Sequence, residues 1–112
     1  MQTHDAKRVS IVIEQVMLRR LTAALESADV TGWTVLPVLG GSGRSGTWHR
    51  DDQITRGAGL VQVLCLVRPD KMDALLAAAF EVVDNHIGVV SVSDAQVIRA
   101  ARVCPVRRGY DR

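Results

Sequence analysis

The chain has few aromatic residues, little net charge and no long apolar run, and each absence excludes a class of protein. Only four of its 112 residues are aromatic, and its formal net charge is +2. So small a charge argues against a nucleic-acid-binding protein, and residues 60–67 offer no aromatic ring on which an RNA base could stack. No apolar run reaches the length of a membrane span, and residues 1–8 lack the apolar centre of a signal peptide. We therefore expect a cytoplasmic protein.

Cysteine and histidine are too scarce and too scattered to indicate a disulfide framework, a metal site or a catalytic set. Of the two cysteines, Cys65 lies in an apolar segment and is predicted to be a small core residue, and Cys104 lies near the C-terminus. His49 and His86 have no partner at metal-ligand spacing. No Ser-His-Asp or Cys-His pair can be argued from spacing, so we expect no catalytic residue and no metal ligand.

Hydrophobic periodicity predicts four strands and two helices in the order β-α-β-β-α-β. The predicted strands are residues 9–15, 33–39, 60–67 and 89–99, and the predicted helices are residues 16–28 and 69–83. The apolar stripe predicted for the second helix consists of Met72, Leu75, Leu76, Ala79, Phe80 and Val83. Pro37 should lie at a bulge or a free edge, because proline cannot donate to a strand ladder. The pattern predicts an α+β, ferredoxin-like fold in which residues 1–112 form a single domain.

In that fold both helices cover one face of the sheet, and the other face is uncovered. The uncovered face would carry Val12, Val61 or Leu60, Val63 or Leu64, and Val90 or Val92. An apolar face of this kind favours a homo-oligomer.

Residues 40–57 interrupt this regular pattern. The run Gly40-Gly41-Ser42-Gly43-Arg44-Ser45-Gly46 combines four glycines with an arginine, and Arg56-Gly57 ends the segment. Glycine lets backbone N–H groups turn toward one point, and arginine adds positive charge. Loops of this length in compact domains are usually functional or disordered. The segment therefore predicts an anion site, with an idle hairpin loop as the alternative.

Four fragments resemble the PII signalling proteins, over about residues 8–102. Gly32-Trp33-Thr34-Val35 resembles the family's Gly-Met-Thr-Val entry to the second strand, and Val38-Leu39-Gly40 with Gly43-Arg44 resembles the start of its T-loop. Arg56-Gly57-Ala58 resembles the end of that loop, and Val97-Ile98-Arg99 resembles the last-strand motif Val-Ile-Arg. The fragments follow one another in the family's order and at its spacing.

The resemblance implies a homotrimer that binds adenine nucleotides in the clefts between subunits. The nucleotide-binding residues that it implies are Thr34, Gly40, Gly41, Gly88, Arg99 and Arg102. The T-loop residues implied for a small anion are Gly41, Ser42, Gly43, Arg44, Arg56 and Gly57. A fixed guanidinium such as that of Arg99 suits a phosphate, and glycine N–H groups complete the cradle. Signalling would then act through a ligand-ordered T-loop on a partner protein.

The chain departs from ordinary PII proteins at the positions that receive their signals. Thr55 stands where those proteins carry a tyrosine that is uridylylated, and Ser45 where a glutamine holds magnesium with 2-oxoglutarate. Counting back from Arg99, Gly88 falls on the lysine that holds the distal phosphates. The second arginine of the last strand is displaced to Arg102. We therefore do not expect uridylylation, 2-oxoglutarate sensing or a firm hold on the γ-phosphate of ATP.

These losses most resemble the carboxysome-associated PII-like (CPII) proteins. That resemblance implies ADP or AMP as the ligand, with ATP and cyclic AMP as alternatives, and bicarbonate near the T-loop. It also implies a regulator rather than an enzyme. Its partner would be a transporter or a carbon-fixation component, and it would be associated with the carboxysome. The alternative is a small trimeric metal-binding or metal-tolerance protein, or an enzyme, of the same fold. Residues 103–112 form a basic tail that is either solvated or folded over the nucleotide.

Overall fold

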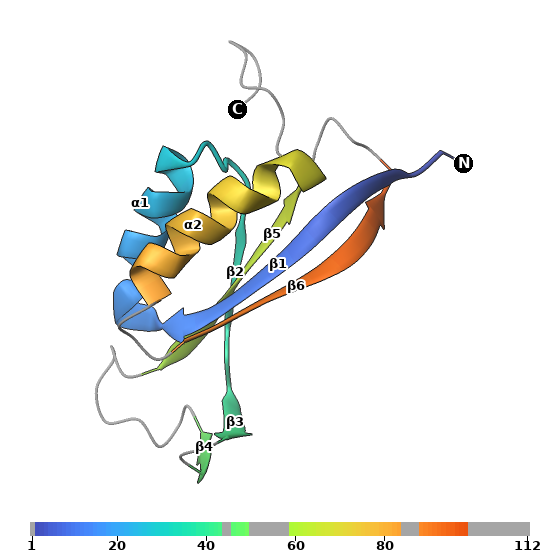
Figure 1. The fold of residues 1–112 in the computed structure, drawn as a ribbon. Helices are drawn as coiled ribbons and strands as arrows, with labels where there is room; N and C mark the ends of the chain where they lie inside the picture. Colours follow the sequence, from blue (N-terminus) through green and yellow to red (C-terminus); the bar gives the residue numbers. More distant parts are fainter. Residues whose placement is uncertain (1, 44–45, 50–58, 84–87, 99–112) are drawn as a thin grey trace.

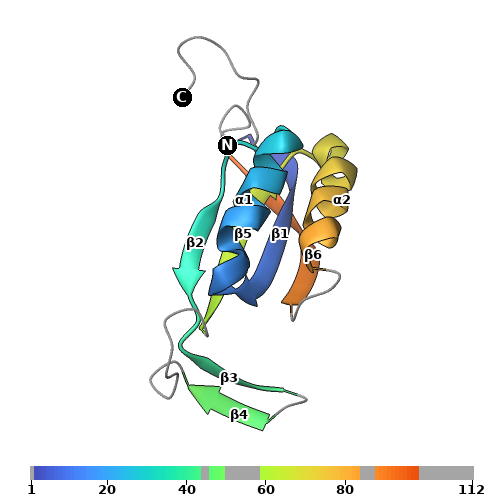
Figure 2. The same cartoon turned by 90° about the vertical axis from the view of Figure 1, so that its left-hand side faces the viewer.

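The computed structural model describes residues 2–43, 46–49, 59–83 and 88–98, and the predicted order of elements is confirmed. The strands are β1 (His4–Glu14), β2 (Thr34–Pro37), β3 (Gly40–Gly43), β4 (Gly46–His49), β5 (Leu60–Val67) and β6 (Gly88–Val97). The helices are α1 (Leu18–Ser27) and α2 (Met72–Val83), each preceded by a 3-10 turn, η1 (Gln15–Met17) and η4 (Pro69–Lys71). Both helices pack on one face of a sheet, and a small hairpin extends from its end (Figures 1 and 2).

The main sheet has the strand order β2-β5-β1-β6, and every neighbouring pair is antiparallel. This is the ferredoxin-like arrangement that the periodicity predicts. β2 pairs with β5 alone and forms an edge of the sheet, so Pro37 lies on an edge strand, as predicted. None of the helices in the described ranges has the length and apolar character needed to cross a membrane.

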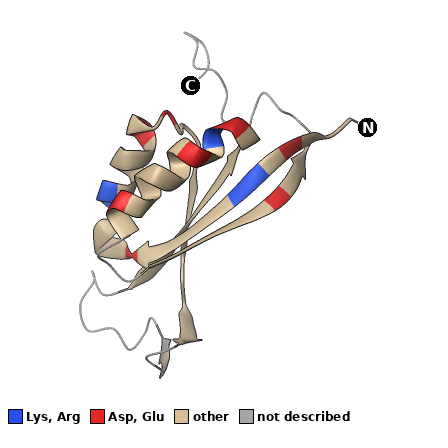
Figure 3. Ribbon diagram, in the orientation of Figure 1, with Lys and Arg blue, Asp and Glu red and all other residues tan. Residues whose placement is uncertain are grey.

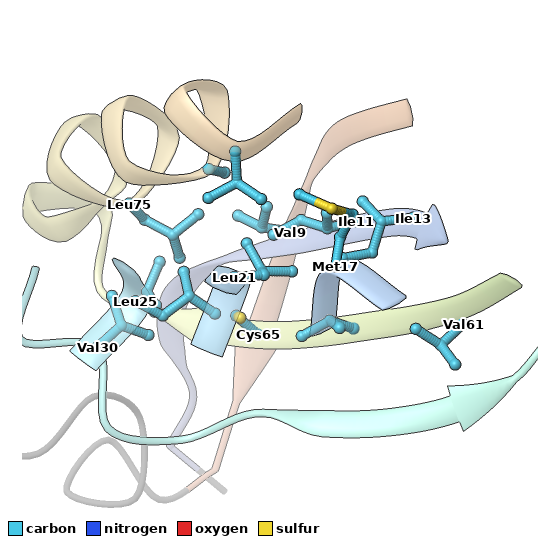
Figure 4. Close-up of a cluster of buried hydrophobic side chains, with 14 residues drawn as sticks. Val9, Ile11, Ile13, Met17, Leu21, Leu25, Val30, Val61, Cys65 and Leu75 are labelled. Carbon is cyan, nitrogen blue, oxygen red and sulfur yellow. The ribbon is translucent and has the colours of Figure 1, made fainter. Parts of the chain in front are cut away.

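The core lies between the sheet and the two helices. Alternate side chains of β1 and β5, including Val9, Ile11 and Val63, point toward the helices and are fully buried. Leu21 and Leu25 of α1 and Leu75 of α2 meet them from above (Figure 4). Each such side chain contributes about 1.5–3 kcal/mol through burial. Cys65 is 2% exposed within this cluster, which confirms its predicted place in the core.

The predicted stripe of α2 is wrong at Phe80, whose side chain is 63% exposed. The buried residues of this helix are Leu75, Ala79 and Val82. Phe80 follows Ala79 and is therefore rotated by about 100° around the helix axis, away from the sheet. Since α1 packs beside α2 without covering that side, the ring of Phe80 is left at the surface.

The face of the sheet opposite the helices, here called the open face, differs in part from its prediction. The strand register places Val12, Leu60 and Leu64 on it, whereas Val61 and Val63 are buried beneath the helices. The prediction that Val90 or Val92 lies on the open face is wrong, because both valines lie opposite β1 residues that face the helices. Val89 takes their place on the open face and is 63% exposed. A shift of one residue in register exchanges the two faces of a strand, so β6 could not be oriented from periodicity alone.

Part of the segment predicted as a loop, residues 40–57, forms a two-stranded sheet. β3 pairs with β4 in the register Gly40↔His49 to Gly43↔Gly46, separately from the main sheet. Glycine has low strand propensity, which is why periodicity did not indicate these strands. Residues 50–58 lie outside the described part of the chain.

Candidate functional site

Thr34 and Gly40 lie at the two ends of one extended run along the edge of the sheet. Thr34 begins β2 opposite Leu64, and Gly40 begins β3. Between them the N–H of Val38 donates to the carbonyl oxygen of Leu60 at 3.1 Å, which holds the run against β5 until the hairpin leaves the sheet. Thr34, which is expected near the nucleotide, is therefore connected to the glycine-rich segment by one extended stretch of backbone.

The start of this run is positioned by the end of α1. Asp29 adopts a left-handed φ of 64°, and the N–H of Val30 donates to the carbonyl oxygen of Leu25 at 2.9 Å. This is the hydrogen bond of a Schellman motif, in which an apolar residue beyond the helix packs back against its last turn. Val30 is fully buried, so the motif anchors the chain four residues before Thr34.

The backbone of Gly40–Gly43 is extended rather than curled into a cradle. Successive N–H groups in a strand point in opposite directions, so those of β3 do not converge on one point in this conformation. Gly41, Ser42 and Gly43 are exposed, and the hydroxyl of Thr47 donates to that of Ser42 at 3.5 Å. An added Cβ at Gly43 would meet no atom within 4 Å, so packing does not require glycine at this position.

Packing does require glycine at Gly88, the first residue of β6. A Cβ there would lie 2.8 Å from Cγ1 of Val83, 3.1 Å from the carbonyl oxygen of Val12 and 3.2 Å from Cγ2 of Ile13. Gly88 lies where the chain returns from α2 to β1. The lysine that ordinary PII proteins are expected to carry at this position could not be accommodated without moving these neighbours.

Four arginines expected at the site lie outside the described residues: Arg44, Arg56, Arg99 and Arg102. Gly57 lies outside them as well. The strand that leads to Arg99 is described as far as Ile98, and polar contacts hold its end to β1. The Thr3 hydroxyl donates to Gln96 Oε1 at 2.5 Å, and Gln96 Nε2 donates to Asp5 Oδ1 at 3.2 Å. Lys7 and Asp94 form an ion pair, and Figure 3 shows oppositely charged residues side by side on β1 and β6.

Thr34 borders a hollow of about 400 Å³ that sequence reasoning missed. Its lining residues are Arg8, Gly32, Trp33, Thr34, Leu64, Cys65 and Leu66. Arg8 was missed because β1 begins five residues before the predicted strand, at His4, and the alternation of polar and apolar residues is weak there. A larger hollow of about 520 Å³ lies beside Pro69. It is lined by the already paired Lys7 and Asp94, so we favour the hollow beside Thr34 as the ligand site.

The described residues contain no group of three or more His, Cys, Asp or Glu side chains that could hold a metal ion. In that part of the chain, therefore, no cluster of side chains supports the alternative of a metal-binding protein. A ferredoxin-like sheet with a glycine-rich hairpin between its second and third strands is instead the architecture expected of a PII-like protein.

Comparison with known families agrees with this architecture. Residues 6–102 match the family described as "Nitrogen regulatory protein P-II", and the chain belongs to this family. Proteins of the PII family are signalling proteins, typically trimers that interact with target proteins. A comparison with curated protein sequences gave no match.

Similar solved structures include those of CPII, a PII-like protein from Thiomonas intermedia K12. One of these structures holds ADP, AMP and bicarbonate. Its chain is 26% identical in sequence to this one, and the two structures match with a TM-score of 0.78 over 88% of this chain and 92% of CPII. Another CPII structure holds ADP and bicarbonate. Its chain is 28% identical to this one, and the match has a TM-score of 0.73 over 88% of this chain and 93% of CPII. A putative PII-like signalling protein from Thermus thermophilus is 18% identical with a TM-score of 0.73, covering 92% and 99%. The last of these supports the fold alone.

Proposed function

We propose that this protein is a PII-like regulator that binds ADP or AMP between the subunits of a homotrimer and bicarbonate near its glycine-rich hairpin. Its ligand state would control a partner in inorganic-carbon metabolism, such as a transporter or a carboxysome component. The observation that carries the proposal is the similarity, over 88% of the chain, to CPII bound to ADP, AMP and bicarbonate.

The proposed nucleotide site uses Thr34, Gly40 and Gly41, the backbone of Gly88, and Arg99 and Arg102. Two features of the described residues support it. Thr34 is exposed beside a hollow whose volume lies within the range of small-molecule sites. Gly88 has no side chain and its neighbours leave little room for one, so this position can serve a ligand only through its backbone. The lack of a lysine there agrees with a nucleotide that has one or two phosphates.

The proposed bicarbonate site uses Gly41, Ser42, Gly43, Arg44, Arg56 and Gly57. Because the N–H groups of β3 alternate in direction, a small anion can gather several of them only if the backbone turns. Glycine makes such a turn inexpensive. An anion that binds the turned state more tightly shifts the population toward it, and the hairpin then presents a different surface to the partner.

A calorimetric panel of AMP, ADP, ATP and cyclic AMP, each with and without bicarbonate, tests the proposal. We expect AMP or ADP to bind, and bicarbonate to bind with measurable heat only when nucleotide is present. Arg99→Ala should weaken nucleotide binding by about 1.5–3 kcal/mol, the contribution of a charge-assisted hydrogen bond.

Arg19→Ala, which removes an exposed arginine of α1, is the matched control and should leave the affinity unchanged. If no adenine nucleotide gives heat at millimolar concentration, the proposed function is wrong. Nucleotide binding that is indifferent to Arg99→Ala would instead contradict the alignment of the last strand.

A further inference from the structure

The ring of Phe80 lies on a side of α2 that faces neither the sheet nor α1, and it is 63% exposed. Lys71, directly before α2, marks the side that faces α1, because its ammonium group pairs with the Asp29 carboxylate just beyond the end of α1. Phe80 follows Lys71 by nine residues, which is about two and a half turns of a helix. Phe80 therefore lies opposite Lys71, and its ring is accessible from the outer side of the helix.

Acidic side chains accompany Phe80 on this outer side. The exposed residues Asp73, Ala77, Phe80 and Glu81 follow the spacing of one helix face and are here called the outer stripe. Asp73 lies seven residues before Phe80, so the two are about 10.5 Å apart along the helix axis. α2 contains no Lys or Arg, and neither of its carboxylates belongs to an ion pair within the described part of the chain. The outer stripe thus offers an aromatic ring among negative charges.

Contact between copies of the chain is expected on the open face of the sheet, on the side away from the helices, and would leave the outer stripe uncovered. Residues 103–112 have the composition that complements this stripe. They lie outside the described residues and beyond residues 6–102, which match the P-II family. Three arginines and one aspartate give their side chains a formal charge of +2, and Tyr110 adds an aromatic ring.

The C-terminal tail also begins close to α2. Gln96, near the end of β6, lines the same hollow as Pro69, which opens the turn before α2. Nine residues separate Ile98 from Arg107, and a chain of that length can span about 30 Å. An extended chain covers about 10–11 Å between Arg107 and Tyr110. That interval equals the spacing of Asp73 and Phe80 along α2, so one arginine and one ring can meet one carboxylate and one ring.

We infer that the C-terminal tail of this chain docks on the outer stripe of α2, with the Arg107 guanidinium paired with the Asp73 carboxylate and the Tyr110 ring against Phe80. An exposed ion pair contributes little by itself, so the aromatic contact is the main anchor and the charges set the direction of the tail. The inference is independent of the proposed function, because no ligand takes part in the contact.

Trypsin cleavage of the full chain after Arg107 and Arg108, followed by mass spectrometry, tests the inference. A synthetic peptide of residues 99–112 gives the rate for an undocked tail. Without nucleotide, we expect the full chain to be cut there at least about fivefold more slowly than the peptide, because trypsin cleaves the undocked population. Phe80→Ala should remove most of this protection, and Asp73→Asn should remove part of it. Salt at about 1 M should also reduce it, since charges are then screened within about 3 Å.

The matched control is Val16→Ala, since Val16 is 66% exposed but precedes α1, and it should leave the protection unchanged. Circular dichroism should show that each variant is folded. A tail cut at the rate of the peptide would overturn the inference. Protection that survives both Phe80→Ala and Asp73→Asn would also overturn it, because the tail would then be held elsewhere. Protection that appears only after ADP is added would mean that the tail covers the nucleotide instead.

Discussion

Gly88, at the start of β6, and Gly32, just before β2, have sharply different surroundings. The space beside Gly88 is filled by Val83 and by the backbone of Val12, whereas Gly32 borders open space. A backbone carbonyl oxygen cannot move aside without disturbing the strand to which it belongs. Gly88 is therefore explained by the junction of α2, β6 and β1, which leaves little room for a side chain at this position.

We predict that Gly88→Ala lowers the free energy of unfolding by about 1–3 kcal/mol, the usual cost of overpacking. Gly32→Ala is the matched control and should change it by less than about 0.5 kcal/mol, as is typical at the surface. Urea titration followed by circular dichroism measures both. Equal stability of the two variants would mean that the start of β6 can shift to admit a methyl group.

The β3–β4 hairpin is held more weakly than the strands of the main sheet. It has two strands of four residues each, and its members whose side chains the structure describes, Gly40–Gly43 and Thr47, lie outside the core cluster. A lone two-stranded hairpin is marginally stable in water. The hairpin is thus suited to change conformation at little cost, while β1 and β5 remain fixed by their buried side chains.

Amide hydrogen exchange should resolve this difference. We expect the amides of Ser42 and Thr47 to exchange much faster than those of Ile11 and Val63, because a lone two-stranded hairpin opens more readily than strands fixed by a buried core. ADP together with bicarbonate should slow exchange in the hairpin and leave β5 unchanged. Hairpin amides as protected as those of β5 without ligand would contradict the proposed switching between two states.

Helices and strands could be predicted from sequence where burial of one face gives the apolar residues a regular spacing. They could not be predicted where contacts between residues far apart in the sequence determine the structure. β5 and α1 follow apolar spacing closely, and α2 does so except at Phe80. The first residues of β1 form a strand because they pair with the end of β6, for example through Lys7 and Asp94, and those residues are 87 positions apart. Arg8 was overlooked for the same reason. The exposure of Phe80 depends on how α1 lies beside α2, which no spacing within one helix reveals.

The open face of the sheet bears on how many chains assemble. Leu36, Leu66 and Val89 are 38%, 43% and 63% exposed there, which is unusual for the face of a sheet left in water. It is less uniformly apolar than predicted, because Gln62 Nε2 donates to the Ser10 hydroxyl at 2.9 Å near its centre. An apolar surface with a satisfied polar pair suits contact with further copies of the chain.

We predict a trimer, with a mass by light scattering three times the 12.2 kDa of the chain. Val89→Glu places a charge on the open face, opposite Val12 and four residues along β1 from Arg8, and should reduce the mass to that of a monomer, because burying an unpaired carboxylate is costly. Phe80→Glu is the matched control, since Phe80 is equally exposed but lies on the helix side. A trimer that tolerates Val89→Glu but not Phe80→Glu would place the interface on the helices instead.

β1 runs the length of the sheet, from His4 at one end to Glu14 at the other, where Glu14 lies opposite Leu60 and the hairpin departs. Eleven strand residues span roughly 36 Å, so the N-terminus and the hairpin lie far apart (Figure 1). An affinity tag at the N-terminus would therefore immobilise the protein with its hairpin facing the solution. That orientation suits the capture of a partner that recognises the hairpin, whereas attachment through surface lysines would give mixed orientations.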